Sequence, residues 1–269
     1  MSRRDIGSRR LDLQAALGST LSAFPRLWLG AAAALVACMA VWLAPLFVSP
    51  EVGSVPVQAA AAGLSTLIAV GALARLSVTD NDQAARAMGL GPAGLQFGRP
   101  ELRLIGAALL CLIFLAMIVI ILSLVVLAIF GTAELDVAAI QARDWGRVGA
   151  PWKLALLGVL GVGALVVPLL LTVRLSLFVP ATLGRRQMVS LNSMGIADGS
   201  FWPLLAGLIV TALPTILLLV LTGAGALTGQ TAKPVWVVGL VAVQLPLMLA
   251  FLGAAYRQLE YWTREEPAP

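Results

Sequence analysis

Apolar residues along this chain gather in six long stretches that are nearly free of charge, and polar residues fill the gaps between them. A helix needs about 20 apolar residues to cross the ~30 Å hydrocarbon core of a membrane, and each stretch is long enough. Backbone groups surrounded by lipid must bond within their own segment, which favours helices. The pattern therefore predicts an all-α polytopic membrane protein. Its six expected transmembrane helices are 27–48, 55–75, 103–130, 152–173, 202–223 and 234–256.

Both ends of the chain lie outside this transmembrane domain, which we place at 27–256. Residues 1–26 are expected to form a polar arm and an amphipathic helix that lies in the membrane interface, because four apolar residues there share one helical face. These four residues are Leu13, Leu17, Leu21 and Phe24. Residues 257–269 are expected to be a polar tail.

The overall composition agrees with a membrane protein. Of the 269 residues, 60% are hydrophobic and only 12% are charged, whereas a soluble domain carries about 25% charged residues. The spans leave no room for a sizeable soluble domain. The two cysteines, Cys38 and Cys111, fall inside apolar stretches and are interpreted as small packing residues.

The basic residues predict an orientation. If the amino-terminus is cytoplasmic, 14 of the 18 lysines and arginines fall in the segments on the cytoplasmic side. Short loops rich in Lys and Arg stay inside, so the chain is expected to have both termini in the cytoplasm. The net charge of +5 is thus assigned to lipid and topology, and no nucleic-acid partner is expected.

Three arginines suggest an internal repeat. Arg75, Arg174 and Arg257 each stand at the cytoplasmic end of an even-numbered span. Parallel repeats are a known way to build membrane proteins, so the chain is interpreted as three pseudo-repeated hairpins, each with a short interfacial helix. The alternative is that an arginine simply ends a helix on the cytoplasmic side.

Candidate chemistry is sparse. The span centres hold no Asp, Glu, Lys or Arg, which argues against a charge-coupled transporter, and the chain has no histidine. The strongest polar residue in a span is Gln244, read either as a lumen contact or as an interhelical hydrogen bond. Asp80 and Asp82 flank Asn81 in a segment interpreted as a solvated turn or a helix N-cap rather than a metal site. No catalytic residue, metal ligand or cofactor is predicted.

Basic residues near the fourth span are the candidates for binding lipid. Arg174, Arg185 and Arg186 are expected either to contact lipid headgroups or to anchor the topology, and the two roles are compatible. Membrane lipids are therefore the expected partner, with another membrane protein as a further candidate. The sequence does not give the oligomeric state.

The segment from Arg174 through Pro180 to Arg186, followed by Ser190-Leu-Asn-Ser-Met-Gly-Ile-Ala-Asp-Gly-Ser-Phe-Trp202, resembles a pattern of bacterial YciC-like inner-membrane proteins. Those proteins resemble the membrane domain of glycerophosphoryl diester phosphodiesterases. The usual Ser-Trp-x-x-Thr helix of the family is replaced here by Ser190-Leu-Asn-Ser-Met. The resemblance implies a six-span fold and a bacterial inner-membrane location, and it implies no activity.

These observations favour a non-catalytic inner-membrane protein that acts as a scaffold, an assembly partner or a lipid-interacting factor. The alternative is a permease-like carrier of a hydrophobic or lipidic solute, built on the Pro- and Gly-rich spans 152–173, 202–223 and 234–256.

Overall fold

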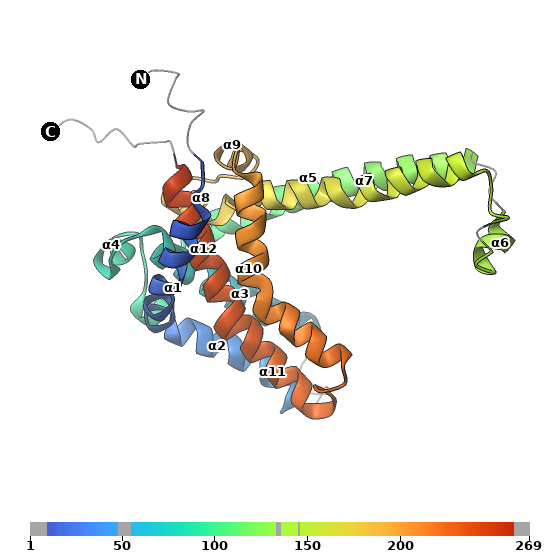
Figure 1. The fold of residues 1–269 in the computed structure, drawn as a ribbon. Helices are drawn as coiled ribbons and strands as arrows, with labels where there is room; N and C mark the ends of the chain where they lie inside the picture. The colour runs from blue at the N-terminus through green and yellow to red at the C-terminus, as the bar shows by residue number, and fades with distance from the viewer. Residues whose placement is uncertain (1–9, 48–54, 133–135, 145, 261–269) are drawn as a thin grey trace, which may run out of the picture.

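The computed structural model describes residues 10–47, 55–132, 136–144 and 146–260, and these residues form helices joined by loops (Figure 1). Five of the helices are long and apolar enough to cross a membrane, or six if a bent pair counts as one span. The expectation of an all-α polytopic membrane protein is therefore confirmed. Arg3, Arg4 and Arg9 lie outside the described residues, as do residues 261–269 of the predicted tail, which include Arg264.

The long helices follow the apolar stretches of the sequence. They are α1 (Leu13–Gly30), α2 (Ala32–Leu43), α3 (Val55–Val78), α5 (Arg99–Thr132), α7 (Pro151–Leu175), α10 (Phe201–Gly223) and α12 (Leu245–Leu259). Shorter helices connect them: α4 (Asp82–Ala87), α6 (Val137–Gln141), α8 (Phe178–Gly184), α9 (Ser193–Ile196) and α11 (Ala232–Val238). Three 3-10 turns (Ala44–Leu46, Pro92–Gly94 and Gly229–Thr231) and a π-helical segment, Gly239–Gln244, complete the described elements.

These helices form a bundle and an arm (Figure 1). In the bundle, α12 packs along α1, α3 and α10, and α2 packs along α3. In the arm, α5 and α7 lie side by side and project away from the bundle, with α6 at the tip. Only 6% of the most apolar part of α5 is buried, and none of that of α7, against 44% for the span that contains α12. The arm therefore offers lipid an apolar surface on nearly all sides.

The first span is bent. The chain bends by 76° at Ala31, between α1, which ends at Gly30, and α2, which begins at Ala32. Gly94, at a backbone φ of +86°, brings its loop so close to Ala31 that a Cβ on it would lie 2.9 Å from the Ala31 Cα. Helix α2 and the following turn, Ala44–Leu46, reach roughly 24 Å, which is less than the ~30 Å core.

Helix α1 is also more deeply packed than a helix lying alone in the interface. Its buried residues are Ala16, Thr20 and Leu27, whereas Leu21 on the expected apolar face is 69% exposed. The backbone N–H of Asp12 donates to Gln258 Oε1 of α12 at 2.9 Å. Helix α1 thus packs against the bundle and is joined to the end of α12, while Leu21 stays exposed to the surroundings.

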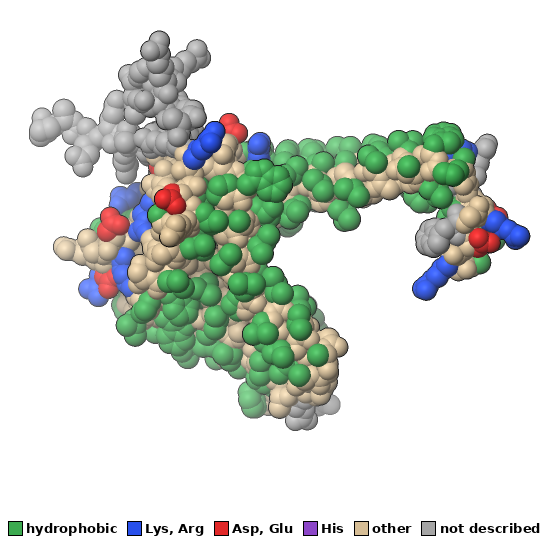
Figure 2. Space-filling model, in the orientation of Figure 1, with side chains coloured by type: hydrophobic (Ala, Val, Ile, Leu, Met, Phe, Trp, Pro, Cys, Tyr) green, Lys and Arg blue, Asp and Glu red, His purple; other side chains and the backbone are tan. Residues whose placement is uncertain are grey.

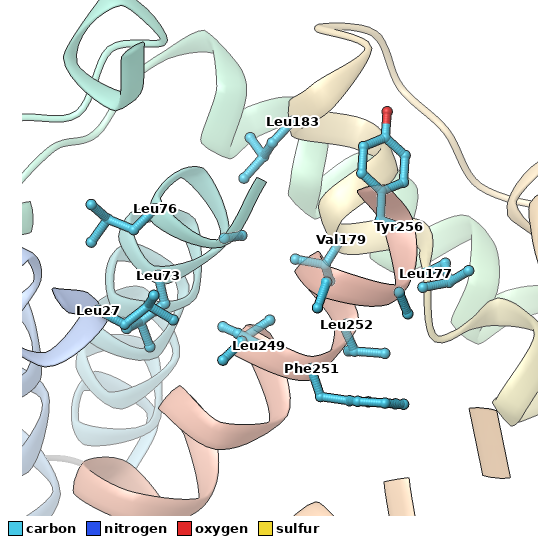
Figure 3. Close-up of a cluster of buried hydrophobic side chains, with 14 of the residues drawn as sticks. Leu27, Leu73, Leu76, Leu177, Val179, Leu183, Leu249, Phe251, Leu252 and Tyr256 are labelled. Atoms are coloured by element: carbon cyan, nitrogen blue, oxygen red, sulfur yellow. The ribbon is translucent and has the colours of Figure 1, made fainter. Parts of the chain in front are cut away.

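The core of the bundle is a cluster of buried hydrophobic side chains around α12 (Figure 3). Glycines let α12 approach two of its neighbours closely. The ring of Phe251, which is fully buried, lies over Gly207 of α10, where an added Cβ would fall 1.9 Å from a ring carbon. On the α3 side, a Cβ on Gly253 would fall 2.4 Å from the Ser77 side chain. Glycine at these two positions lets three helices pack without a gap.

A proline in the last span leaves a carbonyl that another helix satisfies. Pro246 has no N–H to offer Ala242, four residues before it, and the preceding segment is a π-helix in which Leu245 N–H bonds Leu240. The Trp28 indole N–H of α1 donates to the Ala242 carbonyl at 2.8 Å. This bond fixes α1 against the last span at the point where its helical hydrogen bonding is irregular.

Charged side chains gather at two places on the visible surface (Figure 2). One group surrounds α1, α4 and α9, and the other lies at the tip of the arm around α6. The long faces between them are hydrophobic, as expected where a helical protein meets lipid. We call the first region the arginine-rich end, defined by Arg26, Arg75, Arg86, Arg99, Arg103, Arg174, Arg185, Arg186 and Arg257.

Candidate functional site at the arginine-rich end

A buried ion pair lies at the centre of the arginine-rich end. Arg75 in the last turn of α3 and Glu101 in the first turn of α5 are each 1% exposed, and Nη1 lies 2.7 Å from Oε1. Arg75 also donates to the carbonyls of Met88 at 3.1 Å and Gly71 at 3.0 Å. Glu101 Oε2 accepts from the Gly98 N–H at 2.9 Å. The Nη1–Oε1 contact is electrostatic, because Oε1 has no aligned hydrogen-bond donor. The pair joins the bundle to the base of the arm.

Helix α8 is the second connection between bundle and arm. It packs against α3, α5 and α12, and its residues Val179–Leu183 are buried. It ends at Gly184, beside the hydroxyl of Tyr256. The next residue, Arg185, is buried and makes a two-pronged contact with Glu260, from Nε at 3.0 Å and from Nη2 at 2.8 Å. Arg185 thus holds α8 to the end of α12.

The remaining repeat arginines make exposed ion pairs. Arg174 at the end of α7 lies 3.8 Å from Asp198, just before α10. Arg257 at the end of α12 lies 3.3 Å from Asp80, in the loop after α3. Arg75 and Arg174 therefore each pair with an acid at or near the start of the next long helix, whereas Arg257 does not. The three-hairpin repeat remains a prediction.

The acidic segment predicted as a turn or N-cap holds α1 and α4. Asn81 is the N-cap of α4, and its side chain accepts from the Ala84 N–H at 2.7 Å. Asp82 pairs with Arg26 of α1 at 2.7 Å, and Arg26 also donates to the Thr79 carbonyl at 2.8 Å. These bonds fix α4 at the surface of the arginine-rich end.

Four arginines at this end are different, because no acidic side chain among the described residues pairs with them. They are Arg86, Arg99, Arg103 and Arg186, and all four are exposed. Arg103 donates through Nη1 to the carbonyl of Arg186, which brings the two residues together from α5 and from the loop after α8. They line a hollow of about 270 Å³ whose walls include Met88, Pro100 and Leu183. A positively charged, partly apolar hollow can hold an anion of headgroup size.

Arg186 carries backbone strain at this hollow. Its φ is +53°, a left-handed conformation that residues other than Gly, Asn and Asp rarely adopt. Such strain persists only where the surrounding structure imposes it, and it often marks binding or switch sites. Here the buried Arg185, the Arg103 contact to the Arg186 carbonyl and the bond from Thr182 Oγ1 to the Val189 carbonyl impose the turn.

The polar residue predicted inside a span lies apart from this end. Gln244 accepts a hydrogen bond from Thr215 of α10 through Oε1 at 3.0 Å. The contact joins α10 to the last span. On α10, Thr215 follows Gly207 and the buried Thr211 at intervals of four residues, so the three share one helix face. This face packs against the last span.

The three lipid candidates of the sequence are therefore placed in different surroundings. Arg174 and Arg185 each have an acidic partner. Of the three candidates, only Arg186 lines the hollow that it shares with Arg103. Arg103, Glu101 and Glu260 were not singled out by the sequence. A glutamate in the first turn of a long apolar helix was the available signal for Glu101, since charge there needs a partner. Nothing local indicated that Arg103 would meet Arg186, 83 residues away.

Fold and surface together define an all-α polytopic membrane protein. Comparison with protein-family models, with curated proteins and with solved structures gave no match.

Proposed function

We propose that this chain is a non-catalytic protein of the bacterial inner membrane that acts as a lipid-interacting factor, with both termini in the cytoplasm. Its likeness to YciC-like proteins supports the location, and the sorting of its arginines supports the orientation. The observation that carries the function is the division of those arginines into two groups. One group is paired with acids and holds helices together, and the other group is exposed with no acidic partner among the described residues; two of its members, Arg103 and Arg186, line a hollow.

The unpaired arginines fit an anionic membrane surface. Each exposed Lys or Arg near a membrane that contains anionic lipid contributes about 1 kcal/mol of attraction. The arm adds an apolar surface that is nearly all available to acyl chains. A protein that contacts lipid at both the headgroup and the chain level is suited to organise or sense its surrounding lipid, and it needs no catalytic group.

Lipid enrichment tests this function. The full chain is extracted into a mild non-ionic detergent, and the co-purified lipids are compared with those of the source membrane. We expect phosphatidylglycerol or cardiolipin to be enriched several-fold over phosphatidylethanolamine. Lipid in the proportions of the source membrane, together with a stoichiometric protein partner, would contradict the lipid role and favour a scaffold. Stabilisation by an added hydrophobic solute in place of lipid would favour a carrier.

The proposed orientation is tested by cysteine labelling. Cys38 and Cys111 are replaced by alanine, and single cysteines are placed at exposed positions. We expect Arg143→Cys and Thr228→Cys to react with a membrane-impermeant maleimide in intact cells. We expect Asp82→Cys and Asp198→Cys to react only after permeabilisation. The reverse pattern would show that the arginine-rich end faces outward.

A further inference from the structure

Beyond a general affinity for anionic lipid, we propose that the hollow between Arg103 and Arg186 is a site for the phosphate group of one membrane lipid, whose acyl chain lies along α5. This inference rests on the proposed function and names its site. Two arginines, Arg103 and Arg186, line one hollow of about 270 Å³, and neither has an acidic partner among the described residues. A phosphate placed between them would accept hydrogen bonds from both.

The volume and walls of the hollow fit a headgroup rather than a whole ligand. Ligand pockets usually hold about 300 to 1,000 Å³, so a hollow of about 270 Å³ holds one small group. Met88, Pro100 and Leu183 supply apolar surface beside the arginines. Arginine binds phosphate oxygens through a planar fork of donors, and hydrogen bonds of this charged kind are about twice as strong as neutral ones.

The surface that continues from the hollow favours a lipid over a free phosphate ion. On α5, Leu110, Ile113 and Met117 follow Arg103 at spacings that keep them on the same helical face. They are 43%, 55% and 48% exposed. The Met188 side chain, which is 51% exposed, packs over Gly106 one turn after Arg103, with its sulfur 2.8 Å from where an added Cβ would lie. A headgroup at Arg103 would therefore lead its acyl chain directly onto an exposed apolar stripe.

The other hollow at this end is a weaker candidate. It has a volume of about 1030 Å³ and is lined by Arg26, Asp82 and Arg86 between α1 and α4. Arg26 and Asp82 neutralise each other at 2.7 Å, so Arg86 is left as the one unpaired charge of the three. The Arg103–Arg186 hollow differs because both of its arginines lack an acidic partner among the described residues.

The test measures binding to the full chain in a non-ionic detergent. Thermal unfolding is followed while dioctanoyl phosphatidylglycerol, dioctanoyl phosphatidylcholine, sn-glycerol 3-phosphate or inorganic phosphate is added. We expect phosphatidylglycerol to stabilise wild type at the lowest concentration. Arg103→Gln and Arg186→Asn should each raise its half-saturating concentration about tenfold, as expected when a charge-assisted hydrogen bond is lost. Asn is chosen because it tolerates the left-handed backbone of residue 186.

Matched variants separate a specific site from general charge. Arg174→Gln removes the same charge from an exposed arginine of the same end, and we expect it to leave the half-saturating concentration unchanged. Arg186→Gly relieves the positive φ and should fold at least as well as wild type, so it tests the site even if another variant fails to fold. Arg103→Lys keeps the charge without the fork and should give an intermediate value.

Three results would overturn the proposal. The first is a double variant, Arg103→Gln with Arg186→Asn, that responds to phosphatidylglycerol as wild type does. The second is an equal effect of Arg174→Gln. The third is inorganic phosphate that half-saturates at the same concentration as phosphatidylglycerol, which would assign the site to a free anion. If the double variant responds to phosphatidylglycerol as wild type does while wild type enriches anionic lipid on purification, the site is wrong and the proposed function stands; if wild type shows no enrichment, the function itself fails.

Discussion

Replacing Glu101 with alanine is expected to destabilise the protein by about 3 to 5 kcal/mol, one of the largest effects of any single substitution at the arginine-rich end. The change leaves the Arg75 guanidinium charged, 1% exposed and without its acid. The Met88 and Gly71 carbonyls still accept from it, but they do not neutralise its charge. Since the pair joins α3 to α5, the base of the arm should loosen before the rest of the bundle.

The measurement is an SDS titration in mixed micelles, followed by circular dichroism. Arg75→Met combined with Glu101→Leu removes both charges and should cost less than Glu101→Ala alone, because no unpaired charge then stays buried. Asp198→Ala is the matched control. It breaks the Arg174–Asp198 pair, whose side chains are 45% and 78% exposed, and should cost under about 1 kcal/mol. Equal costs for Glu101→Ala and Asp198→Ala would show that burial of the first pair has no energetic weight.

The class of fold was predictable because lipid imposes strong rules on a sequence. Apolar length fixes where helices occur, and the structure has a long helix in five of the apolar stretches and a bent pair of helices at the first. The bend at Ala31 was not predictable in this way, because the residues around it are apolar on both sides and Gly94 approaches from a distant loop. The hydropathy of a segment indicates whether it lies in lipid or in water, and it does not indicate which distant loop packs against it.

The candidate site was predictable only in part, for a related reason. A count of arginines identified the end of the molecule at which they gather, and Arg186 was among the residues singled out. The count of arginines did not distinguish Arg185, which is buried against Glu260, from its neighbour Arg186, which lines the hollow. That separation arises because α8 ends between bundle and arm, so two adjacent side chains point into different surroundings. Partners distant in sequence decide which arginine is structural and which is available.

Replacing Gly207 with alanine is expected to destabilise the bundle by about 1 to 3 kcal/mol, although the same change stabilises most helices. The new Cβ would lie 1.9 Å from the ring of Phe251, which is fully buried. Either the ring leaves its rotamer or α10 moves away from α12. A shift of α10 would also disturb the bond between Thr215 and Gln244, which lies further along the same face.

The control for this prediction is Gly158→Ala on α7, where an added Cβ meets no atom within 4 Å. Alanine is favoured over glycine in a helix by up to about 1 kcal/mol, so this variant should be at least as stable as wild type in the same SDS titration. Combining Gly207→Ala with Phe251→Leu should cost less than the two single changes added together, because the smaller side chain makes room for the new methyl. Strict additivity would mean that Gly207 and Phe251 do not restrict each other, and that the close approach of α10 and α12 has some other cause.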